Sequence, residues 1–251
     1  MEKRQYDELK AQQNIHWWFT GKREIVIDVA KTYLGFEKGN DKKILDVGCG
    51  MGLMLDALQE YGTVYGLDME EEAVEYCNQV LAEQGKAPNV VIGSLPDHVP
   101  FQEGMFDYIF ALDIIEHVKN DTAALNKLYS LLKEDGKLLI TVPALMSMWS
   151  YNDELNHHYR RYEKDELLEK LNGSGLKVIK FSFYNSYLYP FAWTVRKIKR
   201  LLSIKSSDVA DETKNGLTNR LLHKIFVSEK KHLRKGDFRN GVSLIAACSK
   251  G

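Results

Sequence analysis

Residues 43–52 read Lys-Ile-Leu-Asp-Val-Gly-Cys-Gly-Met-Gly, and this stretch decides the fold class. Its first five residues form a short apolar run that is typical of a buried strand. The three glycines then allow a sharp turn in which the backbone can approach a ligand closely. The spacing is GxGxG, because Leu53 stands where the dinucleotide fingerprint GxGxxG has its last glycine.

Short apolar runs alternate with helix-like segments on both sides of this loop. Strands this apolar, alternating with helices, are typical of a parallel sheet that is covered on both faces. The sequence therefore predicts an α/β fold with a doubly wound, mostly parallel sheet. The expected strands are 43–47, 63–68, 89–92, 106–112, 137–142, 176–183 and 241–249, and the expected helices are 53–61, 70–84, 121–133 and 163–171.

The chain divides into three regions. Residues 1–36 are expected to form an N-terminal helical cap. Residues 37–185 together with 241–251 form the main α/β domain, and residues 186–240 form a basic, mainly helical insertion before the last strand.

Composition excludes several classes of protein. The net charge of −1 argues against a wholly basic nucleic-acid binder. Cys49, Cys77 and Cys248 lie far apart without CxxC spacing, which argues against a disulfide framework or a zinc site of paired cysteines. No apolar run approaches the roughly 18 residues of a membrane span, and the first residues are too polar for a signal peptide. We therefore expect a cytoplasmic protein.

Asp68 is the second candidate binding residue. It lies twenty residues after Gly48, at the end of the second expected strand. A carboxylate at that place can accept hydrogen bonds from both hydroxyls of a ribose. The alternative is a solvated loop residue or a helix cap. Together with the glycine loop, Asp68 favours a nucleoside-containing cofactor.

Four segments in order resemble the class I S-adenosylmethionine-dependent methyltransferases. They are ILDVGCGMG at 44–52, YGLDME at 65–70, FDYIFALDIIEHV at 106–118 and LLKEDGKLLITVP at 131–143. The resemblance covers about residues 42–144. It implies a seven-stranded sheet whose last strand is antiparallel, S-adenosylmethionine as the cofactor and S-adenosylhomocysteine as the product.

The resemblance also implies the roles of cofactor-binding residues. Near the methionine part it places Asp46, Gly48, Cys49, Gly50 and Gly52. Asp68 would hold the ribose and Met69 would touch the adenine. Ser94 and Leu95 occupy the place where many relatives have an acidic residue that meets the adenine amine, and Asp97 is a substitute there. Leu112 and His117 would border the transferable methyl group.

Further segments resemble subgroups of methyltransferases. Residues 106–118 are similar to ubiquinone-biosynthesis O-methyltransferases. HWWFTGKREIVI at 16–27 and HHYRRYEKDELLEKL at 157–171 resemble methyltransferases of polysaccharide or lipid-linked glycan pathways. In the first of these, Trp18 is either a core residue or part of a lid whose ring faces the sulfonium cation. Arg23 either pairs with the methionine carboxylate or is a surface residue.

Transfer of a methyl group to a hydroxyl oxygen needs alignment of the reactants and benefits from a general base. The candidates are His117, His157 and His158, and we favour His158; the alternative is a histidine held in a structural hydrogen bond. Asp113, Glu116 and His117, with His157 or His158, could also ligate a metal, as in metal-dependent RNA methyltransferases. Our prediction is that no metal takes part.

The sequence is compatible with three classes of function. We favour a methyltransferase acting on a small-molecule, glycan or lipid-linked acceptor and not on nucleic acid. The second class is a cofactor-binding module without turnover. The third, an NAD-dependent oxidoreductase, is disfavoured by GxGxG in place of GxGxxG.

The C-terminal part of the chain is strongly basic. Residues 194–251 carry 14 basic and 5 acidic side chains, a net charge of +9. Residues 187–206, YLYPFAWTVRKIKRLLSIKS, have apolar side chains at helical spacing among the basic ones. Such a helix either packs its apolar side on the domain or lies on an anionic membrane. We therefore expect peripheral contact with the inner face of the membrane as one of two outcomes.

Overall fold

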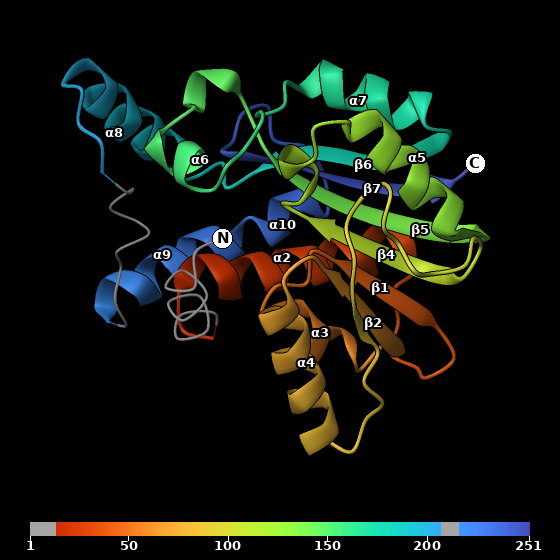
Figure 1. Ribbon diagram of the computed structural model, residues 1–251. Helices are drawn as coiled ribbons and strands as arrows, with labels where there is room; N and C mark the ends of the chain where they lie inside the picture. The colour runs from red at the N-terminus through yellow and green to blue at the C-terminus, as the bar shows by residue number, and fades with distance from the viewer. Residues whose placement is uncertain (1–13, 207–215) are drawn as a thin grey trace.

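The computed structural model describes residues 14–206 and 216–251. A central sheet carries helices on both faces (Figure 1). Its strands are β1 (Lys43–Val47), β2 (Thr63–Asp68), β3 (Val90–Ile92), β4 (Phe106–Leu112), β5 (Leu132–Pro143), β6 (Leu176–Tyr184) and β7 (Ser243–Lys250). The predicted α/β class is confirmed.

The strand order is β3-β2-β1-β4-β5-β7-β6, and β7 is antiparallel to both of its neighbours. The expected seven strands and the antiparallel last strand are therefore present. The strand order reverses between β1 and β4. The strands that follow β1 extend the sheet on one side, and the strands that follow β4 extend it on the other. In open α/β sheets such a switch point forms a crevice outside the carboxyl ends of the strands. The glycine loop after β1 lies at this crevice.

The helices form two layers because each buries one apolar side. One hydrophobic cluster joins α2 (Trp17–Leu34), α3 (Leu53–Leu58) and α4 (Glu71–Glu83) to one face of the sheet. A second cluster joins α5 (Asp121–Leu131) and α7 (Lys164–Gly173) to the other face. Short elements complete the order: η1 (Ile115–His117), η2 (Met146–Met148) and α6 (Tyr151–Leu155).

The largest error in a predicted boundary lies between α5 and β5. The helix expected to reach Lys133 ends at Leu131, and β5 begins at Leu132 instead of Lys137. The reason is tertiary: Leu132 pairs with Phe106 of β4, ahead of an irregularity in the ladder. Asp135 and Gly136, which suggest a helix end in the sequence, lie inside this extended strand.

The N-terminal helix and the insertion pack against each other. The insertion forms α8 (Tyr189–Leu201), α9 (Leu217–Ser228) and α10 (Lys230–Leu233). Asn219 of α9 accepts a hydrogen bond from the amide of Trp17 at 2.8 Å and donates one to the carbonyl of Ile15 at 2.7 Å. The three-region division stays a prediction. No helix within the described residues is long and apolar enough to cross a membrane.

Candidate functional site

The glycine loop is fastened to the neighbouring strand β2. The amide of Gly48 donates to the carbonyl of Leu67 at 2.7 Å, and the amide of Gly50 donates to Asp68 Oδ2 at 2.7 Å. Gly48 and Gly52 have φ angles of 69° and 80°, which other residues rarely adopt. A Cβ atom on Gly48 would also lie 2.6 Å from Ile114 Cδ1. The loop therefore requires glycine for both conformation and space.

Asp68 closes the loop from the end of β2. Its second oxygen, Oδ1, accepts a hydrogen bond from the amide of Glu70 at 3.1 Å. Burial raises the pKa of this carboxyl group, while the hydrogen bonds from Gly50 and Glu70 oppose the rise. Asp46 lies beneath the loop, and burial raises its pKa to about 7 against the nearby charge of Lys22. Contact of Asp68 with a ribose stays a prediction.

Helix α2 brings a lysine to the carboxyl end of β4. Lys22 Nζ lies 2.6 Å from Asp113 Oδ2, and Asp113 Oδ1 accepts a hydrogen bond from the hydroxyl of Thr141 at 2.8 Å. Burial disfavours the ionised Asp113, but Lys22 and Thr141 more than offset this and hold its pKa below the ordinary value. A lysine from the N-terminal helix thus reaches the same crevice as the glycine loop.

Sequence reasoning missed Lys22, because its signal was a single basic residue one helical turn after Trp18. Arg23, which the sequence suggested as a partner of the methionine carboxylate, makes no hydrogen bond or ion pair with another described residue. Trp18 stacks on Phe226 with ring centroids 5.1 Å apart and near Tyr184 at 6.2 Å. This placement favours the packing interpretation of Trp18, and its contact with a cofactor stays a prediction.

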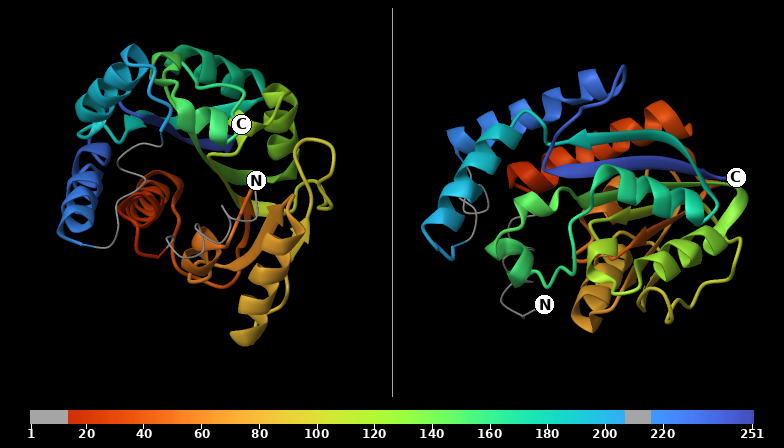
Figure 2. Two further views of the ribbon diagram at one scale, coloured as in Figure 1. Left: turned by 60° about the vertical axis from the view of Figure 1, so that its left-hand side comes forward. Right: turned by 90° about the horizontal axis from the view of Figure 1, so that it is seen from above.

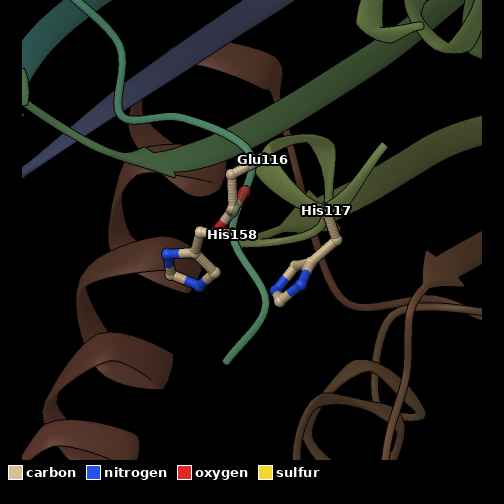
Figure 3. Close-up of side chains that lie close together, drawn as sticks. All are labelled: Glu116, His117 and His158. Atoms are coloured by element: carbon tan, nitrogen blue, oxygen red, sulfur yellow. The ribbon is translucent and has the colours of Figure 1, made fainter. Parts of the chain in front are cut away.

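A cluster of three polar side chains follows β4. Glu116 and His117 lie in η1, and His158 lies in the loop after α6 (Figure 3). The imidazoles of His117 and His158 meet edge to face, with centroids 4.6 Å apart. Burial lowers the pKa of His117 to about 4, and the charge of His158 adds to the effect. His117 is therefore neutral at physiological pH.

Glu116 is the least expected member of this cluster. Its side chain is fully buried, and neither carboxyl oxygen has a hydrogen-bond partner among the described residues. Burial raises its pKa well above the ordinary value, and the charge of Asp113 adds to the rise. Burial therefore favours the protonated form of Glu116.

His158 is oriented by a buried carboxylate. Asp153 Oδ1 lies 2.9 Å from His158 Nδ1 and accepts a hydrogen bond from Arg161 Nε at 2.8 Å, while Oδ2 accepts from the amide of Ser150. Burial opposes ionisation of Asp153, but the hydrogen bond from His158 and the charge of Arg161 hold its pKa below the usual range. Because Asp153 can only accept, His158 Nδ1 carries the proton and Nε2 is left as an acceptor.

The two arginines of the predicted HHYRRY segment have structural partners. Arg161 also donates to the carbonyl of Ala144 at 3.1 Å, and Arg160 lies 2.6 Å from Asp121. These contacts favour the interpretation that both arginines pair with carboxylates, over direct binding of an anionic substrate.

Glu116, His117 and His158 could also hold a cation. Each offers one ligand atom, and these atoms all lie within 4.8 Å of one another. Asp113, the fourth candidate in the sequence, is engaged by Lys22. The prediction that no metal takes part stays a prediction.

The remaining predicted residues line the loop and the strand ends. Met69 is 69% exposed beside Asp68. Ser94 bridges to His98 through backbone hydrogen bonds of 2.7 and 3.0 Å, which close a turn after β3. Cys49 is buried, and Leu95 and Leu112 are partly buried. Their contacts with a cofactor stay predictions.

Comparison with known proteins assigns the central part of the chain. Residues 45–140 match the family model described as "Methyltransferase domain". A ubiquinone biosynthesis O-methyltransferase of Xanthomonas euvesicatoria pv. vesicatoria is 30% identical over 150 residues, covering 54% of this chain and 63% of that protein. The match thus spans less than two thirds of the length of this relative.

Solved structures share the fold. An S-adenosylmethionine-dependent methyltransferase from Archaeoglobus fulgidus has a TM-score of 0.55 and 21% identity, covering 91% of this chain and 94% of that one. Geranyl diphosphate C-methyltransferase from Streptomyces coelicolor, solved with Mg²⁺, geranyl diphosphate and S-adenosylhomocysteine, has a TM-score of 0.58 and 15% identity, covering 88% and 79%. The fold is thus the Rossmann-like fold of class I methyltransferases. Residues 45–140 are thus similar to a methyltransferase domain, within a fold that S-adenosylmethionine-dependent methyltransferases of known structure share.

Proposed function

We propose that the protein transfers a methyl group from S-adenosylmethionine to an oxygen of a small-molecule, glycan or lipid-linked acceptor. The observation that carries the proposal is the hydrogen bond from Gly50 to Asp68, which holds an open glycine loop at the switch point of the sheet. The match to the family model described as a methyltransferase domain includes this loop, and a relative named as an O-methyltransferase is 30% identical to the chain over 150 residues.

The loop and its surroundings fit the cofactor. No atom lies within 4 Å of the place where a Cβ on Gly50 would stand, so the loop is open there, and Met69 is exposed beside the buried Asp68. Lys22 brings a positive charge near the loop and is better placed than Arg23 to balance a carboxylate there. When bound, S-adenosylmethionine supplies a methyl carbon that its sulfonium activates.

His158 is the proposed general base. His158 Nε2 would accept the proton of an acceptor hydroxyl. The bound cofactor would supply the methyl group to that oxygen and leave as S-adenosylhomocysteine. Asp153 holds the imidazole at Nδ1 and is itself held by Arg161, which leaves Nε2 to accept a proton. Burial favours the uncharged forms of His117 and Glu116 beside it, which limits competing charge near His158.

Two measurements test this proposal in order. Calorimetry should show binding of S-adenosylhomocysteine and no binding of NAD; binding of NAD alone would favour an oxidoreductase. Incubation with methyl-labelled S-adenosylmethionine and extracts of lipids, glycans or quinones should then label one extract. Binding of the cofactor with no label in any fraction would favour a module without turnover.

A further inference from the structure

Helix α8 turns its apolar side toward solvent. Phe191, Ile198 and Leu202 recur at intervals of seven and four residues, so they share one face of the helix. Their exposed fractions are 62%, 49% and 64%, and none of the residues Tyr189–Leu201 is buried. We call these three residues the apolar stripe. Figures 1 and 2 show α8 at one end of the molecule, away from the sheet.

Hydrogen bonds on the other side fix this orientation. Arg196 Nη1 donates to the carbonyl of Met148 at 2.8 Å, and Arg200 Nη2 donates to the carbonyls of Ser147 and Trp149 at 3.0 and 2.9 Å. Before the helix, Glu229 Oε1 accepts the amide hydrogens of residues 186 and 187 at 2.7 and 2.8 Å. The apolar side predicted for this segment is therefore divided: Leu188 packs against the core, whereas the stripe is exposed.

Charge and aromatic residues flank the stripe. Residues 187–206 contain five basic and no acidic residues. Lys197 Nζ lies 4.6 Å from the ring centre of Trp193, and both Trp193 and Tyr187 are exposed. An exposed apolar face with basic flanks and aromatic rings is typical of a helix that lies in the interface of an anionic bilayer.

We propose that α8 binds the surface of an anionic lipid bilayer, with the apolar stripe at the boundary between headgroups and acyl chains. A second copy of the chain is a poorer occupant, because it would bring five basic residues against five others. Helix α8 rests on residues 147–149, directly before α6 and the Asp153–His158 pair. Bilayer binding would therefore bring the acceptor side of the site close to a membrane-borne acceptor.

Co-sedimentation with vesicles tests this surface. The full chain should sediment with vesicles of phosphatidylglycerol and phosphatidylcholine, less with added salt, and not with phosphatidylcholine alone. Changing the stripe by Phe191→Ser, Ile198→Ser and Leu202→Ser should weaken binding on the order of a hundredfold. Lys197→Gln and Lys199→Gln should each weaken it about fivefold.

Matched controls separate this surface from general stickiness. Ile179→Ser removes an exposed apolar residue on β6. Lys224→Gln with Lys231→Gln removes two charges from the basic cavity of about 380 Å³ on α9 and α10. Both controls should bind vesicles like the unchanged chain, and all variants should keep the circular dichroism spectrum and S-adenosylhomocysteine affinity of the parent. Retained cofactor affinity keeps this test independent of the proposed function.

Three outcomes would overturn the proposal. One is failure of the unchanged chain to sediment with anionic vesicles at low salt. Another is equal sedimentation of the stripe variant and its parent. The third is a dimer, detected by light scattering, that the stripe substitutions abolish while vesicle binding is absent, which would assign the surface to a second copy.

Discussion

The glycine loop and the histidine cluster lie at the same end of the sheet, but they are built differently. The loop uses backbone amides, and its contacts join neighbouring strands β1 and β2, 18 residues apart for Gly50 and Asp68. The cluster uses side chains from η1 and from the loop after α6, and Lys22 reaches the nearby Asp113 from 91 residues away in the sequence.

This difference has a consequence for substitution. The loop depends on backbone conformations that glycine adopts easily. We expect most of the cofactor binding to come from groups within this local motif. In the cluster, each side chain depends on partners that the fold delivers, such as Asp153 for His158. Changes to the cluster should therefore affect catalysis, whereas changes to the loop should affect cofactor affinity.

The largest effect is expected at His158. His158→Ala should lower kcat by about 10²–10⁴-fold, since it removes the proposed general base, and leave the affinity for S-adenosylhomocysteine unchanged. The matched control is His157→Asn, because His157 is exposed and asparagine tolerates its φ of 55°. Methyl-transfer rates of both variants provide the measurement; equal rates would remove His158 from the mechanism.

Packing should dominate the effect of Trp18→Ala. Loss of the stack on Phe226 should lower the free energy of unfolding by about 3 kcal/mol. Trp193→Ala, at an exposed position, should cost little by comparison. Denaturant unfolding measures both variants. A folded Trp18→Ala protein whose only defect is weak cofactor binding would instead support a lid role for this residue.

At the loop, Asp68→Ala should weaken S-adenosylhomocysteine binding by about 1.5–3 kcal/mol, because a charge-assisted hydrogen bond is lost. Asp135→Ala, on an exposed part of β5, is the control. Titration calorimetry gives both affinities. An unchanged affinity in Asp68→Ala would limit this residue to fastening Gly50.

The pH dependence of kcat should separate the two histidines. A protonated base cannot accept a proton, so kcat should fall on acidification. His117, with a pKa of about 4, is already neutral above about pH 5 and cannot cause a fall there. His117→Gln should therefore keep the acidic limb of the profile and lower kcat less than about tenfold. If the acidic limb disappeared in His117→Gln, His117 and not His158 would be the general base.

The smallest effect is expected from metal removal. Dialysis against a chelator should leave methyl transfer unchanged, because Asp113 is engaged by Lys22 and burial disfavours the ionised form of Glu116 that would bind a cation. Stimulation by Mn²⁺ or Zn²⁺ that Glu116→Gln abolishes would contradict this prediction and place a cation among Glu116, His117 and His158.

Much of the fold and of the loop follows from the sequence alone. Alternation of apolar runs with helical segments determines the α/β class, and the glycines at 48, 50 and 52 with Asp68 locate the crevice, because these signals are local in the chain. The same local signals predicted the wrong end for α5, since pairing of Leu132 with Phe106 outweighs the turn residues that follow.

The tertiary structure alone decided the rest. It selected Lys22 for the crevice, placed Trp18 in an aromatic stack and joined Asp153 to His158 and Arg161. It also decided which side of α8 faces solvent, since helical spacing gives an apolar side and does not say what covers it. The physical reason is common to these cases: a side chain's partners depend on contacts between distant segments, whereas backbone conformation depends mainly on neighbours in the sequence.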